Sequence, residues 1–209
     1  MKRSFRSRRS SKLSKKDQSN NNEKGDGILD WIRTLSIGVF VGIFVVVFFF
    51  QRDDVEGLSM YSFLKDKDIL YTNKIVTYLD LYKRGDIAVI DVSHLGYEDQ
   101  DGYYIKRIIG LPGETVKIAD NSVYIKEVGA SDFYKLDEPY LDEGRKTWVD
   151  DEGEDPVEIT LDENHVFCMG DNREISHDCR AEDVGPIELK RITGIAFIRV
   201  YPFDSFGFL

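Results

Sequence analysis

The apolar positions of the chain form one long block near its start and many short blocks after it. Residues 34–51 are 18 consecutive positions without a charge, including the run Ile43 to Phe50. At 1.5 Å per residue this block predicts a helix about 27 Å long, close to the thickness of a bilayer's hydrocarbon core. Because its β-branched and aromatic residues cover all faces, lipid suits it better than a protein core. With Trp31 and Ile32 added, we expect one transmembrane helix over residues 27–51.

The later apolar blocks are short and favour strands. Runs of apolar or alternating character are separated by Gly, Asp, Asn and Pro; they lie at 86–92, 115–118, 122–125 and 192–200. No window after the predicted anchor has a long amphipathic helical period. The fold class expected for residues 52–209 is therefore mostly β, preceded by a single N-terminal transmembrane helix.

Charge is unevenly placed along the chain. Residues 1–33 hold ten Lys and Arg against four Asp and Glu, a net charge of +6. Because the whole chain has a net charge of −10, the other 176 residues carry −16. The positive-inside tendency predicts that residues 1–26 form a disordered cytoplasmic arm and that the acidic body lies outside the cell membrane. The arm's cations could also bind RNA or anionic lipid, but no nucleic-acid motif accompanies them.

A cleaved signal peptide is the competing interpretation of the apolar block. The block is longer than the usual apolar region of such a peptide, and Gln51-Arg52-Asp53-Asp54 offers no A-x-A-like cleavage site. An uncleaved anchor is favoured.

A strongly acidic segment interrupts the β-like pattern. Between about residues 127 and 163, 14 acidic residues face only three basic ones, which predicts a solvated insertion. The carboxylates of residues 150–155 could attract calcium, but their spacing does not match an EF-hand loop. We expect neither a metal nor a cofactor.

Three stretches after the anchor carry the candidate chemistry: GLSMYSFL at 57–64, YIKRIIGLPGETVKI at 104–118 and GDNREISHDCR at 170–180. In these stretches the chain resembles a type I signal peptidase of the short Gram-positive form. The resemblance covers roughly residues 30–209 and implies a β-rich catalytic core. It also implies that Ser59 is the nucleophile and Lys106 its general base.

The residues themselves support a lysine base. A serine hydroxyl needs an adjacent base, and none of His94, His165 and His177 lies in a stretch typical of a Ser-His-Asp enzyme, although a triad can come in any chain order. Lys106 has bulky apolar neighbours whose burial would favour the neutral amine. In a strand, Lys106 and Arg107 point to opposite faces, so we expect Lys106 to be buried and Arg107 to stay solvated.

The resemblance assigns supporting roles as well. It makes Ser176 a hydroxyl that orients the lysine amine, with Asp178 and Arg180 as an ionic frame, and it gives the Ser59 N–H to the oxyanion hole. Gly57 replaces a second hydroxyl found in some members. The substrate-binding candidates are Met60, Phe63 and Tyr104. Phe63 stands where the family usually has threonine and could reshape the groove.

Cys168 and Cys179 could pair outside the cell, but Cys168 lies in a buried-strand pattern, and two free or structural cysteines are favoured.

The expected function is a membrane-anchored serine endopeptidase that removes signal peptides from preproteins. Its expected partners are those preproteins and membrane lipid. The secretion machinery stays open as a further partner, and we expect no binding of nucleic acid. The alternatives are a dedicated processing peptidase or a silent assembly factor of a pilus or surface-protein locus.

Overall fold

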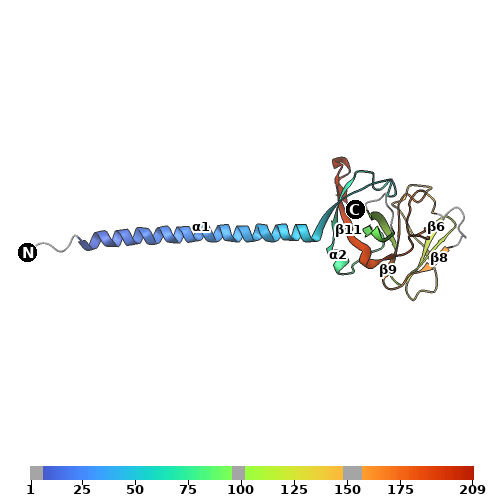
Figure 1. Ribbon diagram of the computed structural model, residues 1–209, viewed down its shortest axis with the longest axis horizontal. Helices are drawn as coiled ribbons and strands as arrows, with labels where there is room; N and C mark the ends of the chain where they lie inside the picture. The colour runs from blue at the N-terminus through green and yellow to red at the C-terminus, as the bar shows by residue number, and fades with distance from the viewer. Residues whose placement is uncertain (1–6, 96–101, 148–156) are drawn as a thin grey trace, which may run out of the picture. The chain divides into compact units, whose positions relative to one another are not determined.

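The computed structural model of the protein describes residues 7–95, 102–147 and 157–209, with the backbone alone for residues 7–26 and His94. The chain divides into two compact units, Met1–Val47 and Phe48–Leu209. Figure 1 shows the helix of the first unit and the strands of the second.

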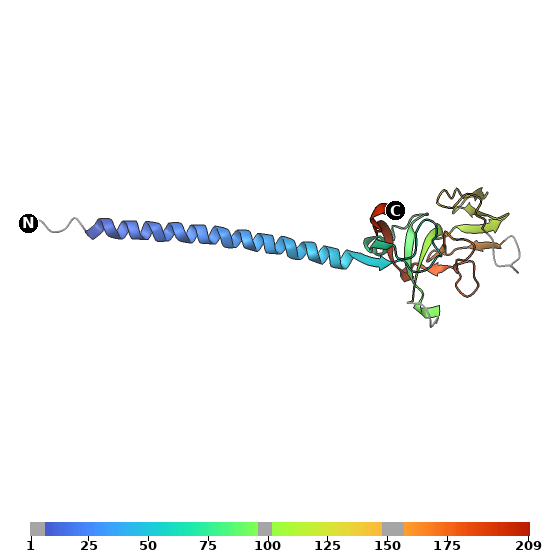
Figure 2. The same cartoon turned by 90° about the horizontal axis from the view of Figure 1, so that it is seen from above.

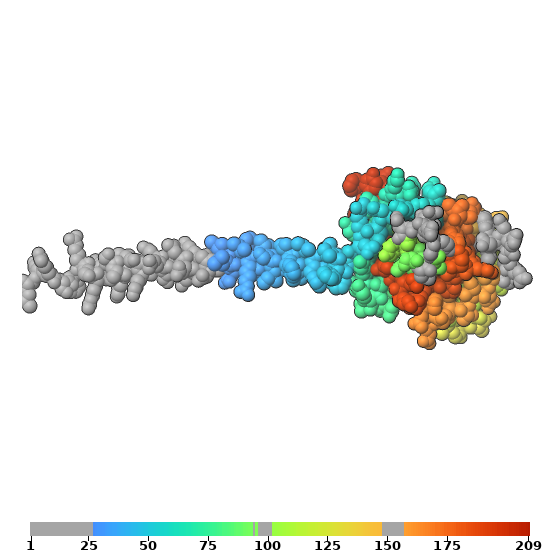
Figure 3. Space-filling view, viewed as in Figure 1, coloured from blue at the N-terminus to red at the C-terminus, as the bar shows by residue number. Residues whose placement is uncertain are grey.

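The first unit contains most of the helix α1, which extends from Ser7 to Phe49. Its part Gly27–Phe49 is 23 residues long with a mean hydropathy of 2.4, and none of its apolar window is buried. By length and composition it can cross a membrane. Figure 3 shows the side chains of this part of the helix in blue. The helix begins well before residue 27 and ends two residues before the predicted boundary, and the disorder of the arm stays a prediction.

The helix gives way to a strand because Phe50 joins the second unit. Phe50 pairs with Asn73, and its ring lies 5.6 Å from the ring of Phe197. Gln51, predicted as helical, therefore belongs to the first strand.

The second unit is mostly β, as the sequence predicts. Its larger sheet has the order β1-β2-β11-β3-β4-β9-β10, with β12 paired to β11. The bounds are Phe50–Asp54 (β1), Ile69–Asn73 (β2), Ile87–Asp91 (β3), Tyr103–Gly110 (β4), His165–Met169 (β9), Ile187–Glu188 (β10), Ile192–Tyr201 (β11) and Gly207–Phe208 (β12). All its described pairings are antiparallel.

A smaller sheet has the order β7-β6-β5-β8. Its strands are Thr115–Ala119 (β5), Ser122–Lys126 (β6), Tyr134–Lys135 (β7) and Val157–Thr160 (β8). Asp120 and Asn121 both have positive φ and form the tight hairpin between β5 and β6, a conformation that Asp and Asn tolerate. β7 and β8 lie within the predicted acidic insertion, which thus contributes to a sheet. Figures 1 and 2 show the two sheets side by side.

The described residues of this unit also form four short helical turns: α2 (Ile75–Tyr78), η1 (Ser93–Leu95), η2 (Leu189–Arg191) and η3 (Phe203–Ser205).

The position of β4 explains its burial. It lies between β3 and β9, and every residue from Lys106 to Gly110 is buried. Gly110 has no room for a side chain, because an added Cβ would lie 2.4 Å from Val116 Cγ2. Ala88, opposite Lys106 on β3, is also fully buried. The strand therefore carries its charged residues into the core.

Candidate active site

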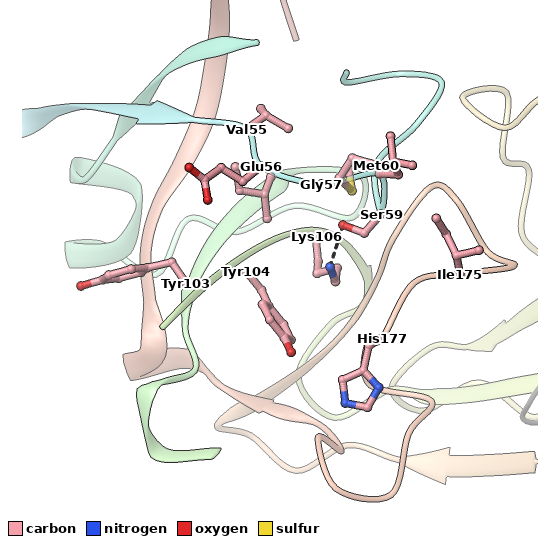
Figure 4. A pocket seen from close by; sticks show the side chains of 12 residues that line it. Val55, Glu56, Gly57, Ser59, Met60, Tyr103, Tyr104, Lys106, Ile175 and His177 are labelled. Carbon is pink, nitrogen blue, oxygen red and sulfur yellow. Dashed lines mark hydrogen bonds between the residues drawn. The ribbon is translucent and has the colours of Figure 1, made fainter. Parts of the chain in front are cut away.

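A cavity of about 420 Å³ opens between the segment after β1 and the start of β4. Ser59 and Lys106 point toward each other in it, from a loop and a strand 47 residues apart in sequence (Figure 4). The lining residues are Val55, Glu56, Gly57, Leu58, Ser59, Met60, Tyr103, Tyr104, Ile105, Lys106, Ile175 and His177.

The Lys106 amine donates a hydrogen bond to Ser59 Oγ over 2.9 Å. Its side chain lies in the core, and its Nζ is 4.7 Å from the centre of the Tyr104 ring. Burial lowers the pKa of Lys106 from 10.5 to about 8, although the Asp178 carboxylate acts in the opposite direction. At pH 7 roughly a tenth of the amine is therefore neutral.

Asp178 and Arg180 form a buried ion pair beside this amine. Arg180 donates from Nε and Nη2 to the two Asp178 oxygens over 2.8 and 2.9 Å. The Gly170 N–H also donates to Asp178, over 2.9 Å. Burial alone would raise the pKa of Asp178, but the hydrogen bonds and charge of Arg180 lower it below its ordinary value. Asp178 is thus held as a carboxylate.

Ser176 lies close to this pair but is not joined to Lys106. Its Oγ is buried and makes no hydrogen bond within the described residues, although it is near enough to help lower the pKa of Asp178. Gly170 packs between Ser176 and the nucleophile segment: an added Cβ there would lie 2.2 Å from Ser176 Oγ and 2.4 Å from the Ser59 carbonyl oxygen. The close approach requires glycine.

The Arg107 side chain is buried, so the expectation that it stays solvated is wrong. It donates to both oxygens of Asp171, over 2.9 and 2.6 Å. Its guanidinium lies 4.8 Å from the ring centre of Phe63 and 4.0 Å from that of Tyr140. An ionic partner and two aromatic faces offset the cost of burying its charge.

Phe63 is consequently absent from the cavity lining, whereas the other two substrate-binding candidates, Met60 and Tyr104, are part of it. The ring of Phe63 packs on Arg107 on the other side of β4 from Lys106. A role of Phe63 in substrate binding stays a prediction.

Comparison with known proteins decides the family. The model of the family "Signal peptidase, peptidase S26" matches residues 28–201. The chain belongs to this family. Signal peptidase I of Bacillus licheniformis is 35% identical over 189 residues, covering 87% of this chain and 93% of that protein. Signal peptidase I T of Bacillus subtilis (strain 168) is 36% identical over 190 residues, covering 88% and 90%.

Signal peptidase I S of Bacillus subtilis (strain 168) is 34% identical over 196 residues, covering 90% of this chain and 97% of that protein. A crystal structure of a signal peptidase I from Enterococcus faecalis V583 matches with a TM-score of 0.40 and 25% identity, over 55% of this chain and 95% of that one. The family match and the Bacillus relatives show that the protein is a signal peptidase I, a serine endopeptidase that removes signal peptides from preproteins. Its N-terminal apolar helix fits a membrane anchor.

The two histidines of this signal peptidase whose side chains are described have partners other than Ser59. His165 Nδ1 lies 2.7 Å from Asp162, and His177 Nε2 lies 3.1 Å from Asp183 at the cavity wall. The side chain of His94 lies outside the described residues. The geometry favours Lys106 over the described histidines as the partner of the hydroxyl.

Both cysteines of the signal peptidase are buried free thiols. The contact with Cys179 and burial raise the pKa of the Cys168 thiol well above its ordinary value. A thiolate nucleophile is therefore disfavoured there.

In the described parts of the chain no group of three His, Cys, Asp or Glu side chains is arranged to hold a metal ion. All the carboxylates considered for calcium, at residues 150–155, lie outside those parts.

Sequence reasoning missed two residues that support the nucleophile segment of the signal peptidase. Asn172 donates from its N–H to the Ser59 carbonyl over 2.9 Å and from Nδ2 to the Leu58 carbonyl over 3.1 Å. Arg145 donates to Asn172 Oδ1 over 2.6 Å. A signal existed for both, since Asn172 belongs to the G-D-N-R motif and Arg145 is one of three cations in the acidic segment.

Proposed function

We propose that this signal peptidase cleaves preproteins by attack of Ser59, with Lys106 as the general base. The observation that carries the proposal is the 2.9 Å hydrogen bond between Lys106 Nζ and Ser59 Oγ in an open cavity. A base must be within hydrogen-bond reach of the proton that it takes, and its pKa should be near the working pH. The lowered pKa of Lys106, about 8, meets the second condition.

In the first half of the reaction, neutral Lys106 takes the Ser59 hydroxyl proton while Oγ bonds to the carbonyl carbon of the scissile peptide. The tetrahedral intermediate then breaks its C–N bond, and the protonated lysine gives the proton to the leaving amine. The product is an ester between Ser59 and the signal peptide, together with the free N-terminus of the mature protein.

In the second half, Lys106 takes a proton from water, whose oxygen adds to the ester carbonyl. Collapse of this intermediate returns the proton to Ser59 Oγ and releases the signal peptide as a carboxylate. The same amine thus serves as base and acid in turn.

The developing oxyanion needs hydrogen-bond donors. The Ser59 N–H is the first candidate, by analogy with the family. Gly57 is not a good second candidate, because its N–H already donates to Asp66 Oδ1 over 3.0 Å.

The frame beside the dyad has a positioning role in this proposal. Asp178 and Arg180 hold the turn that carries Ser176, since Arg180 also donates to the Ser176 carbonyl over 3.2 Å. The Ser176 hydroxyl is buried and makes no hydrogen bond to the described residues, so it is available to orient the Lys106 amine once substrate is bound.

Substrate binds extended along the cavity, next to Met60 and Tyr104. Alternate residues of an extended peptide face the same wall. The first and third side chains before the cut therefore enter the cavity together and must be small.

For topology, we propose that residues 1–26 are cytoplasmic and that Phe48–Leu209 faces the outside of the cell membrane. The ten Lys and Arg of residues 1–33 support this orientation. Ser59 follows the last residue of α1 by ten positions, which keeps the nucleophile within reach of a membrane-tethered preprotein.

The deciding experiment is cleavage of a preprotein with an A-x-A site by purified full-length enzyme. We expect the wild type to cleave it, and Ser59→Ala and Lys106→Ala each to reduce turnover at least about a thousand-fold with an unchanged circular dichroism spectrum. Near-normal activity of either variant would refute the dyad. A folded but inactive wild type would favour a silent assembly factor, and cleavage of one preprotein among many would favour a dedicated processing peptidase.

A further inference from the structure

One loop of the acidic insertion contacts several parts of the site. We call residues 138–147 the brace. It touches the nucleophile segment at Ser62, which donates a hydrogen bond to Asp142, and it reaches β4 through Tyr140, whose ring centre is 4.0 Å from the Arg107 guanidinium. At its two ends Glu138 and Thr147 accept hydrogen bonds from Arg173.

Arg145 is the brace residue that connects to the nucleophile through one intermediate. Its Nη1 donates to Asn172 Oδ1 over 2.6 Å, and its Nη2 donates to Asp142 over 2.6 Å. Asn172 in turn donates to the Leu58 carbonyl from its side chain and to the Ser59 carbonyl from its backbone. Arg145, Asn172 and the Leu58–Ser59 turn are therefore joined by consecutive hydrogen bonds.

We propose that Arg145 is a positioning residue for the cleavage reaction, acting through the Asn172 carboxamide on the turn that carries Ser59. The proposal rests on the proposed nucleophilic role of Ser59. In this proposal Arg145, a residue of the acidic insertion, supports catalysis although it does not contact the substrate.

The chemistry of the two side chains explains why an arginine is needed. A carboxamide has an acceptor end and a donor end, whereas a guanidinium has donors only. Arg145 therefore fixes which end of Asn172 faces it, and the remaining NH₂ must face Leu58. Without Arg145 the carboxamide can rotate, and the Leu58 carbonyl then keeps the Tyr61 N–H as a donor but loses its link to Asn172.

A purely stabilising role fits the site less well. The Arg145 side chain is only 12% exposed, and its Nε is buried without a hydrogen-bond partner among the described residues. A buried donor left without a partner costs stability. The arrangement is better explained by the geometry it imposes on Asn172.

The test compares Arg145→Met with Lys146→Met in the full-length enzyme, using one A-x-A peptide. Lys146 is an exposed cation of the same loop and serves as the control. We expect Arg145→Met to lower kcat at least ten-fold, with KM changed by less than about three-fold, the same midpoint in its pH profile and a folded state at the assay temperature. Arg145→Lys, which keeps one donor group, should recover part of the loss.

Three results would overturn the proposal: wild-type kinetics for Arg145→Met, a loss of rate that only follows its unfolded fraction, or a rise in KM with kcat unchanged. Ser59→Ala, assayed in parallel, separates the two proposals. If that variant stays active, the dyad itself is wrong; if it is inactive while Arg145→Met is normal, only the role of Arg145 is wrong.

A double-mutant cycle with Asn172→Ala tests the route. If Arg145 acts through Asn172, the double variant should lose no more rate than Asn172→Ala alone. Losses that multiply would show that Arg145 acts by another path and would contradict the proposed relay.

Discussion

Lys106 and Arg107 are neighbours on one strand, and both are only 5% exposed. Their side chains leave opposite faces of β4 toward different partners: Lys106 meets the neutral hydroxyl of Ser59, and Arg107 meets the carboxylate of Asp171. The hydrogen-bond partner of Arg107 therefore carries a negative charge, whereas that of Lys106 is neutral. Burial lowers the pKa of Lys106 from 10.5 to about 8 and so shifts it toward the neutral amine.

This difference predicts that Lys106→Met is inactive but more stable than the wild type near neutral pH. The pKa of Lys106 is about 8 when folded and 10.5 as its ordinary value. Below pH 8 the folded state must bind a proton that the unfolded state binds more tightly, which costs about 3 kcal/mol. That cost shrinks between pH 8 and 10.5 and vanishes above.

The measurement is the unfolding free energy of both proteins at pH 7 and pH 10. Lys126→Met is a control, because Lys126 is a more exposed strand lysine with a side chain 31% accessible. We expect a gain for Lys106→Met at pH 7 that is much smaller at pH 10, and little gain for the control. An equal gain at both pH values would show that methionine packing, not the proton, accounts for it.

The rate should rise with pH. Only neutral Lys106 accepts the Ser59 proton, so kcat/KM should increase about ten-fold per pH unit below the pKa and level off above about pH 8. A midpoint near 6.5 would instead indicate a histidine base. His165→Ala, which alters a residue paired with Asp162, should leave the profile unchanged.

Features that depend on local interactions can be predicted from this sequence, whereas features that depend on contacts between distant residues cannot. The anchor, the strand blocks and the three motifs follow from local patterns, and the structure brings Ser59 and Lys106 together as the resemblance implies. The burial of Arg107 does not follow from the strand pattern, because it depends on Asp171, 64 residues away. The position of Phe63 depends on the same guanidinium.

The contacts of the brace could not be predicted from local patterns for a similar reason. Residues 127–163 look solvated because acidic residues dominate their composition, yet Glu138 and Asp142 bind arginines and Arg145 donates a hydrogen bond to Asn172. Composition gives the average environment of a segment and not the partners of its individual residues.

Gly170→Ala should impair catalysis while leaving the protein folded. The new Cβ would collide with Ser176 Oγ and with the Ser59 carbonyl oxygen, so the backbone of the nucleophile turn must move. A displacement of a fraction of an ångström is enough to lower kcat about ten-fold or more. The control is Gly207→Ala, since an added Cβ at Gly207 meets nothing within 4 Å and its φ is not positive. Equal activity of the two variants would contradict a tight contact at Gly170.

Substrate preference should depend on Met60 and not on Phe63. Met60 lines the cavity, whereas the ring of Phe63 packs on Arg107 outside it. We expect the wild type to cleave peptides with alanine at the first and third positions before the cut and to reject leucine, phenylalanine and aspartate there. Met60→Val enlarges the cavity and should admit a larger apolar residue at one of those positions. Phe63→Leu loses a ring–guanidinium contact worth about 1 kcal/mol, so it should lower stability and leave the preference unchanged. The ratios of kcat/KM across the peptide series decide the matter: a shifted preference in Phe63→Leu, with none in Met60→Val, would return Phe63 to the substrate groove.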